Sequence, residues 1–240
     1  MKNVLILIPA YNEEEVLEKN IIKLHDFLEE NIRSYDCRIL ISDNDSIDKT
    51  LKISEGLAKK YKKVYVRHLN RRPMSYSIKK NFLLEDADIY IHMDADLSTD
   101  IKHIPELIKG IEEEYDIVTG SRTSKESKTS RNFHRHLISL FLIFLLRTVF
   151  FIKLSDFQCG FKAINRRVRD NIIPKMKAVN VGFMSTEMLV VANKKGYKIK
   201  EIPVIWKDTR KSKSPIFKGI LDALLNIIKM KINLMRGDYD

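Results

Sequence analysis

Two aspartates separated by one residue, Asp94 and Asp96, follow the apolar run 89–93. Carboxylates at this spacing can share one hard cation, because Mg²⁺ and Mn²⁺ are held by one or two protein carboxylates together with water and substrate phosphates. A nucleoside diphosphate is the natural co-ligand of such a pair. The same residues could instead form a solvated turn in which an aspartate caps the next helix, so other polar residues must discriminate between the two interpretations.

Two more polar clusters follow apolar runs. Tyr11-Asn12-Glu13 comes after 4–8, and Asp43-Asn44-Asp45 comes after 38–42. The Asp43 carboxylate could accept the ring N–H of uracil or guanine. The stretch from 45 to 48 could equally cap a helix that starts near Ile47, since Ser and Asp favour that position.

The elements that must position these residues are those of a doubly wound sheet. Short β-rich runs alternate with amphipathic patterns from residue 1 to about 120, which is typical of an α/β fold with a mostly parallel sheet flanked by helices. Since ligands of such sheets bind beyond the carboxyl ends of the strands, the three polar clusters should converge on one edge. The expected strands are 4–8, 38–42, 64–68, 88–93, 116–119 and 199–206, and a long amphipathic helix is expected over 13–32.

Composition limits the function classes. The 240 residues, 44% hydrophobic and 31% charged, fit one large globular domain rather than a disordered chain, and the net charge of +11 suggests an anionic partner. The two cysteines, Cys37 and Cys159, have neither disulfide-framework nor zinc-site spacing. The chain carries no signature of a nucleic-acid-binding module, so no nucleic-acid partner is expected.

Two apolar segments suggest contact with a membrane surface. The stretch 137–154 is interrupted by Ser139, Arg147 and Lys153 and is too short for a confident span, so an interfacial helix is expected within 133–154. The segment 216–235 is amphipathic, as in helices that lie on a membrane surface, although a dimer seam or a core helix would show the same pattern. We therefore expect a catalytic domain over 1–206, followed by a basic segment and an amphipathic helix over 207–240.

Basic residues flank both apolar segments. Arginine grips phosphate with two parallel hydrogen bonds, so several of these residues could bind the phosphate of an acceptor, although most charged runs are merely solvated surfaces. The residues predicted to bind an acceptor phosphate are Arg122, Arg131, Arg135, Arg210 and Lys213.

The motifs together resemble one enzyme family. Segments 8–13, 43–48, 94–98 and 120–122 stand in the order and spacing of family 2 glycosyltransferases of the GT-A fold, which is Rossmann-like. The later segments 156–162 and 201–206, together with Glu187, are similar to dolichyl-phosphate mannose and glucose synthases. The segment Gln158-Cys-Gly-Phe-Lys162 is more similar to the glucose synthases than to the mannose synthases. The resemblance covers nearly the whole chain.

The resemblance implies an inverting transfer of a hexose to a polyprenyl or dolichyl phosphate. The donor would be a nucleotide-diphosphate sugar, either one similar to UDP-glucose or GDP-mannose. Such an enzyme would act at the cytoplasmic side of a membrane, as a peripheral or monotopic protein, with Mg²⁺ or Mn²⁺ as its cofactor. The residues implied to contact the nucleotide sugar are Pro9, Tyr11, Asn12, Glu13, Asp43, Asp45 and Asp94. Asp94 and Asp96 are the implied metal ligands, and Asp96, Asp156 and Glu187 are the implied catalytic residues.

The chain also departs from the family pattern. Asn70-Arg-Arg-Pro-Met-Ser75 replaces a Gly-rich loop, so Arg71 or Arg72 could substitute for close backbone approach to the diphosphate. Three alternatives remain open at this point: a transferase with a saccharide or soluble acceptor, which would need Asp156 or Glu187 as a base; a nucleotidyltransferase; and a catalytically impaired, membrane-binding relic.

Overall fold

The structure, a computed structural model, describes all residues except 131–132, 179–180 and 208–215, and describes no side chains at 133–136, 181–182 and 216–220. The strands are β1 Asn3–Ala10, β2 Asp36–Asp43, β3 Val64–His68, β4 Ile89–His92, β5 Ile117–Ser121, β6 Lys128–Ser130, β7 Lys162–Asn165, β8 Ile199–Pro203 and β9 Ile205–Lys207. The helices are α1 Leu17–Asn31, α2 Thr50–Lys60, α3 Met74–Leu84, α4 Ile104–Glu112, α5 Phe133–Phe150, α6 Arg166–Asn171, α7 Val181–Lys194 and α8 Ile216–Met235, with short 3₁₀ helices at Ile101–His103 and Ile173–Lys175.

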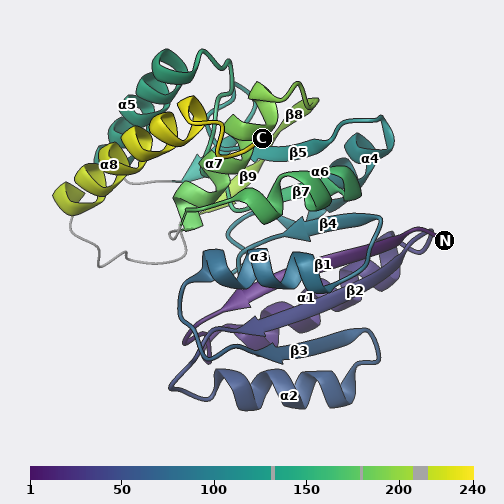
Figure 1. The fold of residues 1–240 in the computed structure, drawn as a ribbon. Helices are drawn as coiled ribbons and strands as arrows, with labels where there is room; N and C mark the ends of the chain where they lie inside the picture. The colour runs from purple at the N-terminus through teal and green to yellow at the C-terminus, as the bar shows by residue number, and fades with distance from the viewer. Residues whose placement is uncertain (131–132, 179–180, 208–215) are drawn as a thin grey trace.

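A seven-stranded sheet forms the centre of the molecule, in the order β3-β2-β1-β4-β7-β5-β8 (Figure 1). All neighbouring strands in it are parallel except β7, which runs antiparallel to both β4 and β5. The sequence-based prediction of a mostly parallel α/β sheet of the GT-A type is thus confirmed.

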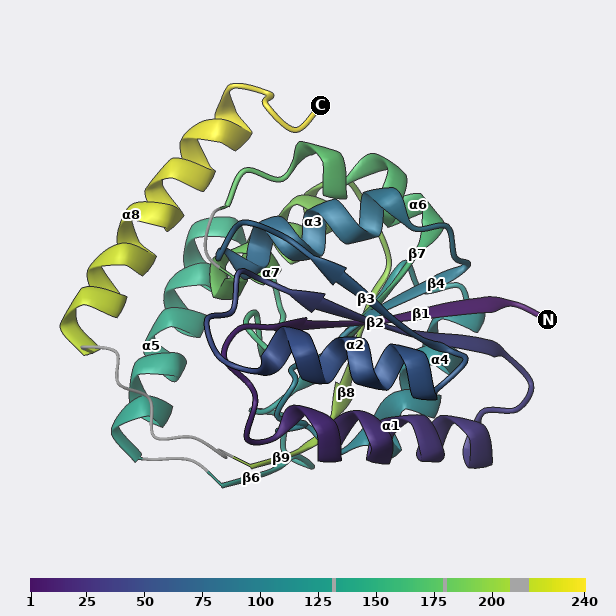
Figure 2. The ribbon, with the colours of Figure 1, turned by 90° about the horizontal axis from the view of Figure 1, so that it is seen from below.

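Helices cover both faces of the sheet (Figure 2), and alternation along the strands sends side chains to two cores. Val4, Ile6 and Ile8 of β1 pack with buried residues of α1, α2 and α4. Leu5 and Leu7 point to the other face, where α3, α5, α6, α7 and α8 contribute to a second core. A strand buried on both faces reads as a continuous apolar run, which is why β1 was evident from the sequence.

Two elements differ from the sequence-based prediction. β7 was not expected, because its four residues begin with a lysine and lack a long apolar run. The single strand expected at 199–206 is divided in two: β8 ends at Pro203, which has no N–H to continue the ladder, and β9 leaves the sheet to pair with β6.

α5 and α8 lie next to each other beyond the main sheet (Figure 1). Each buries one face in the second core, and each carries an exposed apolar stripe on the opposite side. The stripe on α5 is Leu137, Leu140, Phe141 and Phe144, and that on α8 is Leu221, Leu225, Ile228, Ile232 and Met235. None of the helices in the described part of the chain combines the length and apolar character that crossing a bilayer requires.

Candidate active site

The polar clusters that follow β1, β2 and β4 lie at one edge of the main sheet, where its parallel strands end (Figure 1). β1 pairs in parallel with both other strands, so Ala10 lies opposite Asp43 and Leu7 lies opposite His92. The first residue of β7, Lys162, pairs with His92 at the same edge. The structure therefore brings the three clusters together, as the sequence predicted.

Asp43 ends β2 with a completely buried carboxylate. Its Oδ2 accepts a hydrogen bond from Nδ1 of His68 at 2.7 Å. Its Oδ1 has no hydrogen-bond partner among the described residues. A buried carboxylate oxygen without a donor is costly, so a donor from a bound molecule would satisfy this atom.

The loops after β1 and β2 are fastened to each other by hydrogen bonds. Asn12 adopts a left-handed backbone conformation with φ of 54°, which asparagine tolerates. Its Oδ1 accepts from the Ile47 N–H at 3.0 Å, and its own N–H donates to the Ser46 Oγ at 3.1 Å. The Glu13 N–H donates to the Thr50 hydroxyl at 2.7 Å. These bonds hold 45–49 as a turn, so α2 begins at Thr50 rather than near Ile47.

Arginines occupy the loop before α3. The Arg72 guanidinium lies 5.6 Å from the centre of the Tyr11 ring, and its Nε is 3.6 Å from Oδ2 of Asp45. Arg71 lies over the Tyr76 ring at 4.9 Å. Positive charge thus stands beside Tyr11 and Asp45, in the segment that departs from the family pattern.

Asp94 follows β4 and lies against Gly160. A β-carbon built on Gly160 would be 2.5 Å from Asp94 Oδ2, so only glycine lets the backbone approach this carboxylate so closely. The loop is braced from both sides, because Asp96 Oδ1 accepts from the Ser98 N–H at 3.0 Å and the Asn20 amide of α1 donates to the carbonyl of the intervening residue at 2.9 Å.

A cleft of about 560 Å³ opens beside these loops, between Asp96 and the start of α1. Acidic and amide groups line it, among them Asn12, Glu13 and Asp48. The cleft connects the loop after β1 to Asp96, so one extended polar ligand could contact both.

Arg122 follows β5 and is paired with Asp156. Its Nε and Nη2 donate to the two carboxylate oxygens at 2.7 and 3.0 Å, and its backbone N–H donates at 3.1 Å. Glu201 in turn accepts from the N–H groups of Ser155 and Asp156 at 2.8 to 2.9 Å. Burial alone would raise the pKa of the Asp156 carboxyl, but the adjacent Arg122 outweighs burial and holds that pKa below its usual range.

Comparison with known proteins identifies the family. Residues 5–173 match the family model of glycosyl transferase family 2. The chain belongs to glycosyl transferase family 2. The dolichyl-phosphate beta-glucosyltransferase ALG5A of Trichomonas vaginalis is 30% identical over 95% of this chain and 72% of its own length.

Two other relatives of this family 2 glycosyltransferase are much longer than this chain. The glycosyltransferase AglD of Haloferax volcanii is 29% identical over 93% of this chain and 36% of its own length. The dolichol-phosphate mannosyltransferase of Pyrococcus furiosus is 28% identical over 94% of this chain and 62% of its own length. The chain therefore spans little more than a third of the first and under two thirds of the second. Glucosyl-3-phosphoglycerate synthase of Mycobacterium tuberculosis, solved with UDP, has the same fold, with a TM-score of 0.71 at 15% identity over 96% of this chain and 80% of that one.

Glu187 of the family 2 enzyme is buried in α7. Within the described part of the chain, its hydrogen bonds join it to Lys177, Ala178 and Tyr239, and not to the loops after β1, β2 and β4. Its carboxylate accepts from the N–H groups of Lys177 and Ala178 at 3.0 and 2.8 Å and from the Tyr239 hydroxyl. These bonds join α7 to the segment before it and to the residues after α8. A role for Glu187 near the sugar stays a prediction.

Four of the predicted phosphate ligands cannot be placed. Arg131, Arg210 and Lys213 lie outside the described residues, and the side chain of Arg135 is not described either. Pro9 is buried in β1, directly before the last residue of the strand, Ala10, and Asp45 is half-exposed beside Arg72.

Lys162 and His92 are site residues to which the sequence analysis assigned no role. Lys162 is buried, and its Nζ donates to the Cys159 carbonyl. Burial lowers the pKa of Lys162, with Asp94 and Asp156 among the charges that oppose the shift. Burial and the charge of Lys162 lower the pKa of His92 to about 3, so this imidazole is neutral. A lysine between Phe161 and Ala163 in an otherwise apolar run was the available signal.

The donor set after β4 suits a divalent ion. No group of three His, Cys, Asp or Glu side chains in the described part of the chain is arranged to hold a metal. Asp94 and Asp96 nevertheless supply hard carboxylate oxygens from two residues, which is how Mg²⁺ is usually held when phosphates of a substrate complete its shell. The residues present therefore fit Mg²⁺ or Mn²⁺.

Proposed function

We propose that this glycosyltransferase transfers a hexose from a uridine-diphosphate sugar to a polyprenyl phosphate, such as dolichyl phosphate, at a membrane surface. Relatives at 28 to 30% identity are named as dolichyl-phosphate glucosyl- and dolichol-phosphate mannosyltransferases, which supports the acceptor class. The observation that carries the donor assignment is the single unpartnered carboxylate oxygen of Asp43.

The hydrogen bonding of Asp43 favours uracil over guanine. Guanine presents a ring N–H and an adjacent exocyclic amine, which together match both oxygens of a carboxylate. Uracil presents one ring N–H between two carbonyl groups. Because His68 already donates to Oδ2 at 2.7 Å, one oxygen remains, and it suits the single ring N–H of uracil. Tyr11 follows Ala10, which lies opposite Asp43 in the sheet, so its ring is available to stack on the base.

The binding of nucleoside diphosphates tests this assignment. With Mg²⁺ present, calorimetry should show UDP binding more tightly than GDP. In Asp43→Ala, UDP affinity should fall by about 10- to 150-fold, the equivalent of a hydrogen bond to a charged group, about 1.5–3 kcal/mol. Asp36→Ala is the matched control, since Asp36 stands at the opposite end of the same strand. Equal binding of GDP and UDP, or an unchanged UDP affinity in Asp43→Ala, would contradict the assignment.

The diphosphate and the acceptor phosphate would meet at the carboxyl ends of β4 and β5. Asp94 and Asp96 would hold Mg²⁺ or Mn²⁺, which supplies positive charge to offset that of the departing nucleoside diphosphate. Arg122 spends Nε and Nη2 on Asp156, so Nη1 is the guanidinium nitrogen that we assign to the acceptor phosphate.

A phosphate acceptor also suits the state of the carboxylates. A saccharide acceptor needs a general base, but Asp156 is committed to Arg122, and Glu187 already accepts hydrogen bonds from three donor groups. A phosphate monoester has its second pKa near 6 and is largely deprotonated at neutral pH. Its oxygen can therefore displace the nucleoside diphosphate in line, with inversion at the anomeric carbon, without a strong base.

The exposed apolar stripes on α5 and α8 support action at a membrane surface. Phe144 and Ile228 are 66% and 56% exposed, and similar residues recur at helical spacing on each helix. Stripes of this kind let a helix lie in the interfacial region of a bilayer. A polyprenyl chain would then stay in the lipid while its phosphate reaches the sheet edge.

A further inference from the structure

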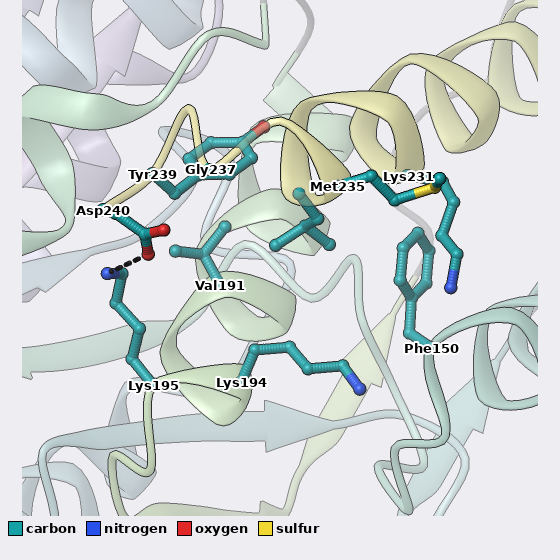
Figure 3. Close-up of a pocket in the computed structure, with 10 residues that line it drawn as sticks. Phe150, Val191, Lys194, Lys195, Lys231, Met235, Gly237, Tyr239 and Asp240 are labelled. Carbon is teal, nitrogen blue, oxygen red and sulfur yellow. Dashed lines mark hydrogen bonds and ion pairs between the residues drawn. The ribbon is translucent and has the colours of Figure 1, made fainter.

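A pocket of about 270 Å³ lies at the C-terminal ends of α5, α7 and α8, where the three helices meet (Figure 3). Its walls are mostly apolar and come from Phe150, Val191, Leu234, Met235 and Tyr239. For comparison, an engineered apolar cavity of about 150 Å³ holds one benzene molecule. The pocket can therefore hold a short length of hydrocarbon chain but not a whole lipid.

Three lysines also line the pocket, and two of them lack an acidic partner. Lys195 pairs with Asp240 at 3.1 Å. Lys194 of α7 and Lys231 of α8 form no ion pair with any carboxylate in the described part of the chain. Figure 3 shows both side chains extending toward the side of the pocket where Phe150 lies. Positive charge is therefore concentrated at one side of an apolar cavity.

The pocket is continuous with the surface that we assign to the membrane. Met235 lines the pocket and is also the last member of the exposed stripe on α8, where it is 78% exposed. A chain in the outer part of a bilayer would reach the pocket without crossing water. Its charged headgroup would then lie at the level of the lysines, since lysine side chains extend toward the polar interface.

We propose that this pocket binds one acyl chain of an anionic phospholipid, with the lipid phosphate between Lys194 and Lys231. The site is separate from the acceptor site, because the acceptor phosphate must reach Asp94 and Arg122, and neither residue lines this pocket. The proposal is therefore independent of the chemistry of transfer, but it rests on the membrane contact proposed above. Such a lipid would fix the ends of α5, α7 and α8 to one another on an anionic membrane.

The test is calorimetric binding of dihexanoyl-phosphatidylglycerol, used below its micelle concentration so that no bilayer surface contributes. The double variant Lys194→Gln/Lys231→Gln should bind it roughly 30-fold more weakly, since each lysine near a lipid phosphate contributes about 1 kcal/mol. Lys229→Gln is the matched control: Lys229 is an exposed lysine on the same helix that does not line the pocket, and its loss should leave affinity unchanged.

Two comparison ligands separate the possible sources of binding. Dihexanoyl-phosphatidylcholine has the same chains without net charge, and inorganic phosphate has the charge without chains. Both should bind far more weakly than the phosphatidylglycerol. Equal affinity for phosphatidylcholine, equal affinity for phosphate alone, or full affinity in the double lysine variant would each overturn the proposal. Thermal unfolding of every variant verifies that the fold is intact, and these are surface substitutions that leave the core unchanged.

Discussion

Replacing Gly160 with alanine tests the contact that positions Asp94. The new β-carbon would lie 2.5 Å from Asp94 Oδ2 and 2.9 Å from Asp94 Cγ and Oδ1. Restoring ordinary contact at about 3.4 Å requires the carboxylate to move by roughly 0.9 Å. The backbone at Gly160 is not in the left-handed region, so the cost of this substitution arises from the contact alone.

A displacement of about 1 Å at a reacting centre can cost roughly 100-fold in rate. We therefore expect the turnover of Gly160→Ala to fall by about two orders of magnitude, and overpacking to lower its unfolding free energy by about 1–3 kcal/mol. The assay is transfer of radiolabelled glucose from UDP-glucose to a short polyprenyl phosphate, with denaturant unfolding measured in parallel.

The matched control is Gly56→Ala, because Gly56 lies in α2 with open space around it. That variant should keep wild-type turnover and gain about 1 kcal/mol of helix stability. If the turnover rate of folded Gly160→Ala were within about threefold of the wild-type rate, the reaction would tolerate a displaced Asp94 carboxylate. The claim that Gly160 positions Asp94 for the reaction would then be refuted.

Three further predictions concern stability and reactivity. Asp156→Asn leaves the buried Arg122 without its negative partner and should cost about 3–5 kcal/mol in denaturant unfolding; a loss below about 1 kcal/mol, the size of an exposed pair, would show that water screens this ion pair. Tyr239→Phe removes the hydroxyl that donates to the buried Glu187 carboxylate and should lower the unfolding free energy by about 1.5–3 kcal/mol; an unchanged value would argue against that hydrogen bond. Burial raises the pKa of Cys37 to about 11, so its thiol stays protonated at pH 8 and should react with a disulfide reagent quickly only after unfolding; fast labelling of the folded protein would contradict this burial.

The parts of the fold that local sequence signals specify were predictable. β1, β2 and β4 are apolar runs that end in polar residues, and the parallel register brings those ends to one edge of the sheet. Asn12 and Asp43 could thus be placed at one edge of the sheet before the strand pairing was known. The amphipathic pattern of α8 was equally visible, and its outer face is exposed as expected.

Features that depend on distant partners were not predictable. The role of Arg122 toward an acceptor phosphate stays a prediction, but its pairing with Asp156, 34 residues away, was not foreseen, because no local pattern reports such a pairing. Glu187 meets the Tyr239 hydroxyl across 52 residues of sequence. β7 is held by pairing with β4 and β5 rather than by its own short sequence, so tertiary context outweighed weak local propensity.

The measurement to make first is transfer of radiolabelled sugar from UDP-glucose and from GDP-mannose to a short-chain polyprenyl phosphate in detergent, with Mg²⁺, with Mn²⁺ and with EDTA. The site geometry predicts a lipid-extractable product from the uridine donor, formed with either metal and lost in EDTA. A folded protein that gives no lipid-extractable product from either donor would contradict the proposed reaction, and product from GDP-mannose alone would contradict the assignment of Asp43 to uracil.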